Sequence, residues 1–338
     1  MAITVAASEA GDPPEDEAFF CRVFDAEGHS RAVALDALAQ CCPTDDALAW
    51  VDLGDAPDEM LDAVWRAWEL PQAARTFMED GTAPGVGQEG GHFWARVIVA
   101  DGSGNREKLA GSVLSCIAGD NRVVTFHRQP IDFVEDMRGR QWGNGALGVL
   151  CAESFVATLL DCQLASYFKA INDYEIAIER LEVRILGERA RDMLPELQRL
   201  RRWASRLRRM LAPHRRVFGA LSRPDFRPDE NRTAERHFVA LDTRFERAMD
   251  MVENARELVL GSFELFSNQT ALRTNDAMRV LTFVTVVTGL LATIVGALGM
   301  NFRAGFFKTD DVGFFAVVGG LLLLAAGAFL LGRHRRWF

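Results

Sequence analysis

Two long runs of uncharged, mostly apolar residues near the end of the chain determine its organisation. The first extends from Val280 to Phe302 and the second from Val312 to Gly332. A helix rises about 1.5 Å per residue, so each run can cross the ~30 Å hydrocarbon core of a bilayer. Two such runs separated by one short loop are not typical of buried helices in a soluble protein. The pattern predicts two membrane-spanning helices, with most of the chain before them.

Charges flanking the two runs predict the orientation of the chain. Basic residues lie just before the first run and just after the second, in the tail formed by residues 333–338; they are Arg273, Arg279, Arg333, Arg335 and Arg336. The connecting loop, residues 303–311, carries as many acidic as basic side chains. Cytoplasmic flanks are enriched in Lys and Arg, so both termini are predicted to be cytoplasmic, with the protein in the cell (inner) membrane. Residues 1–20 do not resemble a signal peptide.

The segment from residue 18 to residue 145 changes its hydrophobic period repeatedly, which predicts a cytoplasmic domain with both strands and helices. It follows an acidic, turn-rich stretch, residues 1–17, that we interpret as a loose tail. The predicted strands are Phe19–Phe24, Ala49–Leu53, His92–Ala100, Lys108–Ile117 and Arg122–Arg128, and the predicted helices are Ala32–Cys41 and Asp58–Leu70. We therefore expect a mixed or antiparallel sheet with helices packed on it.

Three glycines, Gly85, Gly87 and Gly90, match the spacing of a dinucleotide-binding fingerprint. That motif requires a strand before it and a helix after it. Here Thr-Ala-Pro precedes the glycines and a strand-like segment follows at Gly91, so we interpret the segment as a flexible loop. The chain also has no Walker A sequence and no visible arrangement of nucleophile, base and orienting group. We expect neither an enzyme nor a covalently bound cofactor.

Net charge argues against a nucleic-acid-binding protein, and cysteine spacing argues against a cysteine-based metal site. The net charge of −9 over 338 residues does not suggest a nucleic-acid-binding protein. The six cysteines show neither CxxC spacing nor a Cys/His pattern typical of metal ligands. In a cytoplasmic domain they are expected to be reduced thiols.

Residues 146–222 have apolar positions at helical steps, interrupted near Gly187 and Pro195, and this pattern predicts a long helical hairpin. Its second arm is rich in arginine: Arg199, Arg201, Arg202, Arg206, Arg208, Arg209, Arg215 and Arg216. We favour a solvated face that counters acidic neighbours. The alternative is a basic collar that binds acidic lipid.

Residues 229–302 are predicted to form a stalk helix that continues into the first membrane span. Between Thr233 and Leu298 there is no proline, and one helix of this length would be roughly 100 Å long. Apolar residues at alternating steps of three and four form a seam: Phe238, Leu241, Phe245, Ala248, Val252, Ala255 and Val259. We expect that one small domain cannot bury this seam, which predicts a homo-oligomer.

A stripe of small and polar residues continues along the same helix into the membrane. It consists of Asn275, Met278, Thr282, Thr285, Gly289, Ala292 and Gly296, which share one helical face. Small residues on such a face permit close helix packing. Alternatively, the stripe lines a pore between symmetry-related copies, because two spans cannot enclose a pathway alone. Glu264 lies in phase with the stripe and is either part of an acidic vestibule or an ordinary surface residue.

The stretch from Thr274 to Phe302 resembles the first transmembrane segment of the CorA-type metal ion transporters. The hallmark of that family is Gly-Met-Asn at the outer end of this helix, here Gly299, Met300 and Asn301. The resemblance implies an α+β cytoplasmic domain, a helical hairpin, a stalk helix and two C-terminal spans, assembled as a funnel-shaped homopentamer in membrane lipid. It also implies that divalent cations pass through a pore lined by the first span.

The predicted mouth of this pore suits a hydrated metal ion. Helix carboxyl ends and the Asn301 amides offer oxygen acceptors to the water shell, so outer-sphere binding at Asn301 is expected. Mg²⁺ gives up its waters reluctantly, and the stripe has no Cys, His or carboxylate within the span.

The identity of the ion is predicted from departures from the family pattern. The loop after Asn301 lacks the acidic Met-Pro-Glu type sequence of the magnesium branch, and the first span lacks its usual proline. These departures favour a transporter of Zn²⁺, similar to ZntB, or of a broader range that includes Mg²⁺, Co²⁺ and Ni²⁺. The retained Met300 favours the alternative, a dedicated Mg²⁺/Co²⁺ importer. A membrane-anchored structural protein without transport is a remoter alternative.

Overall fold

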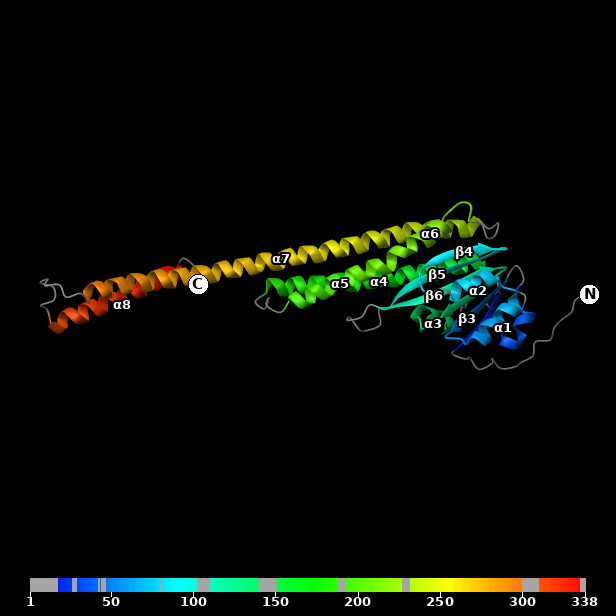
Figure 1. Cartoon of the computed structure of the whole chain (residues 1–338), viewed down its shortest axis with the longest axis horizontal. Coiled ribbons are helices and arrows are strands. Elements are labelled where there is room, and N and C mark those ends of the chain that lie inside the picture. Colours follow the sequence, from blue (N-terminus) through cyan, green and yellow to red (C-terminus); the bar gives the residue numbers. More distant parts are fainter. Residues whose placement is uncertain are drawn as a thin grey trace, which may run out of the picture. The chain divides into compact units, whose positions relative to one another are not determined.

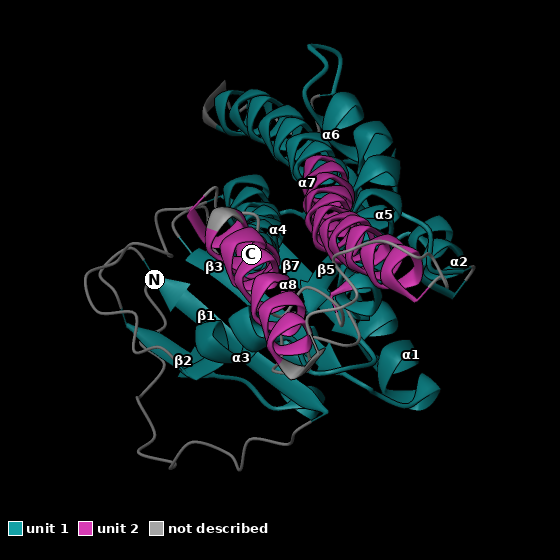
Figure 2. Cartoon of the chain, turned by 90° about the vertical axis from the view of Figure 1, so that its left-hand side faces the viewer, with its two compact units in different colours: residues 1–180, 194–260 teal, residues 181–193, 261–338 magenta. Residues whose placement is uncertain are grey.

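The structure is a computed structural model that describes residues 18–25, 29–41, 43, 47–79, 81–101, 110–139, 151–187, 193–226, 232–299 and 310–334. The chain forms two compact units (Figure 2). Residues 1–180 and 194–260 form the first unit, and residues 181–193 and 261–338 form the second. Two helices, α4 (Ala152–Leu186) and α7 (Arg232–Leu298), contribute to both units.

A seven-stranded sheet with the order β2-β1-β3-β7-β6-β5-β4 lies in the first unit (Figure 1). Its strands are β1 (Phe19–Asp25), β2 (Ser30–Ala32), β3 (Ala47–Gly54), β4 (Gly85–Glu89), β5 (His92–Asp101), β6 (Ala110–Gly119) and β7 (Arg122–His127). β3 and β7 are parallel, whereas the other neighbouring pairs of this sheet are antiparallel. The prediction of a mixed sheet is confirmed.

A tryptophan-rich core joins the sheet to η1 (Leu35–Gln40), α1 (Asp58–Trp68) and α2 (Gln72–Glu79). The apolar face predicted for α1 is buried: Leu61, Val64, Trp65 and Trp68. The Trp68 indole N–H donates to the carbonyl oxygen of Leu38 over 3.3 Å, so its one polar group is satisfied inside the core. Burial of this apolar face, more than helix propensity, stabilises α1 in place.

A second layer of the first unit is helical. It contains α3 (Asp132–Gly139), most of α4 (Ala152–Leu186), α5 (Leu194–Leu211), η3 (Ala212–His214), α6 (Arg215–Leu221) and the first part of α7. Phe155 of α4 packs against Trp50 of β3 at a ring-centroid distance of 5.3 Å. Phe245 of α7 stacks on Phe218 of α6 at 5.1 Å. Aromatic contacts therefore join the helices to the sheet and to one another.

The seam of α7 is buried inside the first unit, which corrects one expectation from the sequence. All seven seam residues, from Phe238 to Val259, are at most 5 % exposed. Ion pairs flank the seam, from Arg208 to Glu253 at 3.3 Å and from Arg215 to Glu246 at 2.7 Å. Neighbouring helices of the same chain thus supply the partner, so the seam is no argument for a homo-oligomer.

Three predictions of local structure were wrong or incomplete. Residues 85–89, interpreted as a flexible loop, form β4 and pair with β5. Only a 3₁₀-helix, η1, and the short strand β2 replace the helix predicted from Ala32 to Cys41. The sequence analysis also missed α2 and α3, because each is only 8 residues long, shorter than the about 11 to 18 residues over which helical periodicity is recognised.

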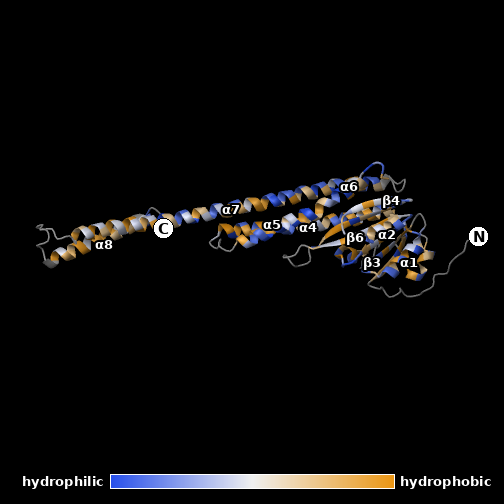
Figure 3. Cartoon of the chain, in the orientation of Figure 1, coloured by the Kyte–Doolittle hydropathy of each residue, from blue (hydrophilic) through white to orange (hydrophobic). Residues whose placement is uncertain are grey.

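The second unit contains the apolar part of α7 and α8 (Asp310–His334), together with the end of α4. Hydrophobic colour follows the C-terminal part of α7 and most of α8 (Figure 3). Both helices are long and apolar enough to cross a membrane. As predicted, α7 runs without interruption through its 67 residues.

Side chains replace a neighbouring strand along the part of β5 that extends beyond β4. The Ile98 N–H donates to Nε2 of His214 over 2.8 Å, and the Ile98 carbonyl accepts from Gln163 Nε2 over 2.7 Å. The Ala100 N–H donates to Ser166 Oγ over 3.1 Å. Helix side chains therefore satisfy the strand edge, which would otherwise expose unpaired backbone groups.

His214 must be neutral to fulfil this role. Its Nδ1–H donates to the Leu211 carbonyl oxygen over 3.0 Å, which leaves Nε2 as the acceptor for Ile98. Burial lowers the pKa of His214 from 6.5 to about 4, against the raising effect of backbone hydrogen bonds. Because the unfolded chain binds this proton more readily, the folded state loses stability as the pH falls from 6.5 towards 4.

We expect His214→Gln to reduce the acid sensitivity of the fold. The Gln oxygen can accept the Ile98 N–H without titrating, so the loss of up to about 1.4 kcal/mol per pH unit should disappear. Melting temperatures of the full-length protein in detergent, measured between about pH 7 and pH 4.5 by tryptophan fluorescence, test this. His237→Gln, at an exposed histidine of α7, is the matched control. Parallel pH profiles for wild type and His214→Gln would contradict the role assigned to His214.

Candidate functional site

In the second unit, α7 and α8 run alongside each other in opposite directions (Figure 1, Figure 2). The less exposed positions in the apolar part of α7 recur at steps of three and four: Val280, Phe283, Val287, Leu291, Ile294 and Leu298. On α8 the less exposed positions include Gly313, Val317, Leu321, Ala325, Ala328 and Gly332. Glycine and alanine at most of these α8 positions permit a close approach of the two helices. One face of α7 is therefore covered by α8.

The stripe predicted from the sequence lies on the other side of α7. Its residues are all exposed: Asn275, Met278, Thr282, Thr285, Gly289, Ala292 and Gly296. At about 100° per residue, the stripe is centred roughly half a turn away from the face that α8 covers. In the described part of one chain the stripe is thus left uncovered.

The stripe presents neutral oxygen atoms and bare backbone within the apolar span. The Thr285 hydroxyl donates to the Leu281 carbonyl oxygen over 2.8 Å, and its own oxygen remains an acceptor towards the outside. A Cβ added to Gly289 or Gly296 would meet no atom within 4 Å. This surface can accept hydrogen bonds from water and leaves room for another helix or for a column of hydrated ions.

Two of the remaining predicted site residues, Glu264 and Gly299, lie before and after the stripe along the chain. Gly299 follows the last helical residue and donates its N–H to the Val295 carbonyl oxygen over 2.9 Å. Met300 and Asn301 lie outside the described residues. Glu264 is exposed on α7 and lies in phase with the stripe. Its exposure agrees with both interpretations made from the sequence.

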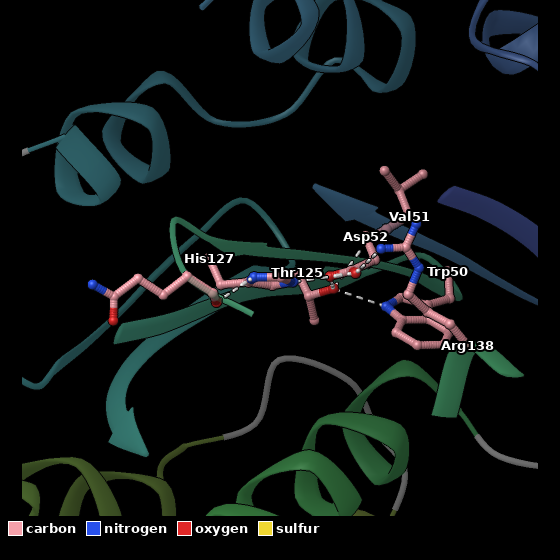
Figure 4. A network of polar contacts seen from close by, with 7 residues as sticks. Trp50, Val51, Asp52, Thr125, His127 and Arg138 are labelled. Carbon is pink, nitrogen blue, oxygen red and sulfur yellow. Dashed lines mark hydrogen bonds and ion pairs between the residues drawn. The ribbon is translucent and has the colours of Figure 1, made fainter. Parts of the chain in front are cut away.

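A second group of polar residues, in the first unit, was missed by the sequence analysis. Asp52 of β3 is fully buried and accepts a hydrogen bond of 2.5 Å from Thr125 Oγ1 of β7 (Figure 4). Its other carboxylate oxygen lies 3.3 Å from His127 Nε2 and 3.5 Å from an Arg138 nitrogen. The Trp50 indole N–H donates to Thr125 Oγ1 over 2.9 Å. The network joins the parallel strands β3 and β7 to α3.

The hydrogen bond and negative charge of Asp52 raise the pKa of His127. Burial lowers the pKa of His127, but the hydrogen bond and the negative charge of Asp52 outweigh this effect, so the net pKa is raised above 6.5. His127 Nδ1 also lies 2.8 Å from the Gln129 carbonyl oxygen. The paired imidazolium therefore contributes stability that is present below pH 6.5 and is lost as the pH rises through the folded pKa.

The network does not have the geometry of a catalytic triad. The Thr125 hydroxyl donates to the Asp52 carboxylate and not to an imidazole, His127 pairs with the same carboxylate, and Thr125 is fully buried, out of reach of a substrate. A structural role follows: the network satisfies a buried carboxylate. A carboxylate within a strand of buried residues, as in Ala-Trp-Val-Asp-Leu, is the one signal in the sequence that could have indicated it.

Comparison with known families identifies the chain. The family model described as CorA-like Mg2+ transporter protein matches residues 45–333, which include the sheet, the hairpin and both apolar helices. The chain belongs to this family. It is a family of transporters, which agrees with the prediction that the protein is not an enzyme.

Three curated relatives of this CorA-family chain carry similar names. The cobalt/magnesium transport protein CorA of Thermotoga maritima is 26 % identical over 200 residues, which cover 59 % of this chain and 57 % of that protein. The divalent cation transporter CmaX of Pseudomonas aeruginosa is 26 % identical over 56 % of each chain. The putative metal ion transporter YfjQ of Bacillus subtilis is 23 % identical over 69 % of this chain and 73 % of its own. The chain thus spans less than two thirds of the matched CorA and CmaX proteins.

Solved structures confirm the fold. The complete CorA magnesium transporter from Methanocaldococcus jannaschii superimposes with a TM-score of 0.69 at 17 % identity, over 96 % of this chain and 100 % of that one. A full-length CmaX protein gives 0.70 at 21 % identity, with the same coverage. The cytoplasmic domain of ZntB from Vibrio parahaemolyticus gives 0.57 at 9 % identity, over 75 % of this chain and 99 % of that one. The α/β domain, the long helix and the two apolar C-terminal helices are therefore shared with the CorA and CmaX structures, whereas the ZntB domain matches only part of the chain.

We expect Asp52→Asn to destabilise the first unit. Removing the buried charge leaves His127 and Arg138 without their shared partner, which costs about 3–5 kcal/mol. The loss should be largest below pH 6.5, where His127 is charged, and should shrink as the pH rises. Melting temperatures of the full-length protein across this pH range measure it.

Asp62→Asn is the control for this prediction. Asp62 is 61 % exposed and pairs with Arg75 at 3.3 Å on the surface, so its loss should have little effect. Equal shifts in melting temperature for the two variants would show that the Asp52 network is not a stabilising unit.

Proposed function

We propose that this CorA-family chain transports divalent metal cations through a pore lined by the stripe of α7 between copies of the chain. The observation that carries the proposal is the position of the stripe. It lies opposite the face covered by α8 and is exposed along the whole apolar part of the helix. Neutral oxygens and glycines on an uncovered transmembrane face suit a water-filled pathway better than contact with lipid.

A pore of this kind requires several copies of the chain, and we propose a funnel-shaped homopentamer in the cell (inner) membrane. Two spans in one chain cannot enclose a pathway, so symmetry-related copies must complete it. Both termini are placed in the cytoplasm, as the basic residues after the second span favour. The seam of α7 gives no support for the homopentamer, because its residues are buried within one chain.

The outer mouth is assigned to Gly299, Met300 and Asn301. At the carboxyl end of α7, carbonyl oxygens carry partial negative charge and attract cations. The Asn301 amide adds an oxygen that accepts hydrogen bonds from the water shell of an arriving ion. Outer-sphere binding of this kind suits an ion that keeps its waters. Glu264, in phase with the stripe, would add an acidic ring to the cytoplasmic vestibule.

For the transported ion we propose Zn²⁺ or a broader range that includes Mg²⁺, Co²⁺ and Ni²⁺. The loop after Asn301 carries Arg303, and its acids are balanced by bases, so capture of cations at the mouth is weak. Relatives named as cobalt/magnesium transport proteins and as a divalent cation transporter support a divalent cargo. A dedicated Mg²⁺/Co²⁺ importer is the alternative, supported by Met300 in the motif. Uptake of each metal into liposomes containing the purified protein decides between them.

We expect Gly289→Leu and Gly296→Leu to stop cation flux while the protein still assembles. Each change places a bulky side chain on the stripe once per subunit, and no atom of the same chain within 4 Å opposes it. Flux is measured with a metal-sensitive dye inside liposomes, and assembly by native mass spectrometry.

The matched control for the stripe is Gly327→Leu on α8. Gly327 is exposed, also has no atom within 4 Å of an added Cβ, and lies away from the α8 face that contacts α7. This variant should transport as the parent does. Equal loss of flux at Gly327 and Gly289 would mean that the pore face is assigned incorrectly.

We expect Asn301→Ala to abolish divalent flux without changing the oligomer mass. Losing a hydrogen bond to charged hydration water costs about 1.5–3 kcal/mol, and all copies lose it together. Asn301→Asp should retain binding but hold the ion too tightly for release. Transport of Zn²⁺, Mg²⁺ and Co²⁺ by Asn301→Ala at the parental rate would rule out the assigned mouth and favour a membrane anchor.

A further inference from the structure

Within the first unit, α4 and α5 lie on opposite sides of α7. Arg244 of α7 pairs with Asp161 of α4, and Glu253 of α7 pairs with Arg208 of α5. At about 100° per residue, Arg244 and Glu253 point half a turn apart on α7, so the two partner helices flank it. Each copy of the chain therefore has one flank formed by α4 and another formed by α5.

Two stacked aromatic rings fix the relative heights of residues on these helices. Tyr174 of α4 and Trp203 of α5 lie 4.7 Å apart with their planes almost parallel, and the Tyr174 hydroxyl donates to the Leu200 carbonyl oxygen over 3.2 Å. Tyr174 is therefore level with Trp203. Because α4 and α5 form an antiparallel hairpin, each residue forward on α4 corresponds to one residue back on α5 (Figure 1).

The side of α4 that points away from α5 carries Asn172, Ile176 and Glu179, which are exposed. Each lies about half a turn around the helix from Tyr174. Ile176 is 37 % exposed, and Glu179 has no ion-pair partner among the residues that the structure describes. This α4 flank thus combines an amide, an apolar side chain and an unpaired carboxylate.

The side of α5 that points away from α4 has complementary chemistry. Gln198 and Arg201 are exposed there, Ser205 is half-buried, and all three lie about half a turn from Trp203. No carboxylate in the described part of the chain pairs with Arg201. The Ser205 hydroxyl donates to the Arg201 carbonyl oxygen over 3.0 Å, and its own oxygen can still accept a hydrogen bond.

Residues at the same height on the two flanks match each other. The level pairs are Asn172 with Ser205, Ile176 with Arg201, and Glu179 with Gln198. The Asn172 amide can donate to the Ser205 oxygen, and Ile176 can pack on the aliphatic stem of Arg201. The Arg201 guanidinium then lies about 4.5 Å in height from Glu179, a distance that its side chain spans. One chain cannot make these contacts, because its two flanks face in opposite directions.

We propose that the α4 flank of one copy docks on the α5 flank of the next copy, with Glu179 paired to Arg201 of its neighbour. The proposal rests on the assembly inferred above, in which copies surround a common axis along α7. Rotation about such an axis keeps every residue at its own height, so the two flanks meet level for level. In a closed cyclic assembly each α4 flank faces an α5 flank, which is a head-to-tail contact.

A second copy is favoured over other occupants because this matching of heights follows from symmetry. An unrelated partner would have to reproduce both the spacing and the order of the three pairs. The like charges on the two flanks do not oppose the contact: Lys169 is level with Arg208, whose charge Glu253 already offsets at 3.3 Å. The contact would hold the copies together outside the membrane, independently of the stripe.

Cross-linking of the full-length protein in detergent tests the contact. A variant that combines Asn172→Cys with Ser205→Cys is treated with a short bismaleimide and separated under denaturing conditions. It should give a ladder of covalently joined copies, because the two introduced thiols meet only between copies. The single variants are matched controls and should give no ladder beyond that of the parent, since a head-to-tail contact brings unlike positions together.

Three results of this experiment would overturn the contact. A ladder from either single variant would mean that like flanks meet. No ladder from the double variant, while native mass spectrometry shows an intact oligomer, would remove this contact and leave the proposed pore in place. A monomeric mass for the parent would overturn both the contact and the assembly on which it rests.

Reversal of the two charges gives an independent measurement. Glu179→Arg and Arg201→Glu should each raise the protein concentration at which half of the oligomer dissociates by at least about threefold, because like charges then meet. The combined variant restores an opposite pair and should recover the parental value. Arg202→Glu is the control, because Arg202 is exposed but points about 100° away from Arg201, and its reversal should have no effect. No recovery in the combined variant, or an equal loss for Arg202→Glu, would overturn the assigned pair.

Discussion

The continuous helix α7 packs against other helices of the first unit along its first part and is apolar enough to cross a membrane along its last part. The rest of the structure depends on how each part is covered. The first part of α7 buries its seam against helices of the same chain, and the apolar part receives cover from α8 on one face only. Inside a bilayer the backbone hydrogen bonds must be satisfied within the protein, and the continuous helix α7 makes them within its own segment. A polar route along this helix therefore uses the side chains and glycines on its uncovered face, which form the stripe.

Periodicity in the sequence predicted which face of α7 is apolar, but not which segment covers that face. Phe245 and Val252 were placed correctly on the seam, yet their partners were expected in another copy of the chain. In the structure Phe245 stacks on Phe218, which lies 27 residues earlier in the chain. A helical repeat records apolar spacing and carries no information about the partner. The helical spacing also placed the stripe residues on one face of α7. In the structure α8 covers the opposite face, which leaves the stripe uncovered.

Interactions between residues far apart in the chain were beyond the sequence analysis for a physical reason. Asp52 and Thr125 are 73 residues apart and meet only because β3 and β7 pair in parallel. Nothing local predicts that pairing, since a parallel pair requires a long crossover connection instead of a short turn. The same holds for His214, which satisfies Ile98 across 116 residues. His214 and His127 both stabilise the sheet. Burial lowers the pKa of His214 and keeps it neutral, whereas the Asp52 carboxylate raises the pKa of His127 and favours its charged form.

In the proposed pore, the absence of charge along the stripe assigns different tasks to its ends and its middle. Neutral hydroxyl and backbone oxygens between Thr282 and Gly296 can accept hydrogen bonds from water, but they attract a cation only weakly. A preference for cations must therefore arise where negative charge is available, at the carboxyl end of α7 near Asn301 and at Glu264 in the vestibule. Weak binding in the middle is an advantage for conduction, because an ion must also leave each site that it enters. A hydrated ion that keeps its water shell needs only hydrogen-bond acceptors along the middle of the stripe and negative charge at its two ends.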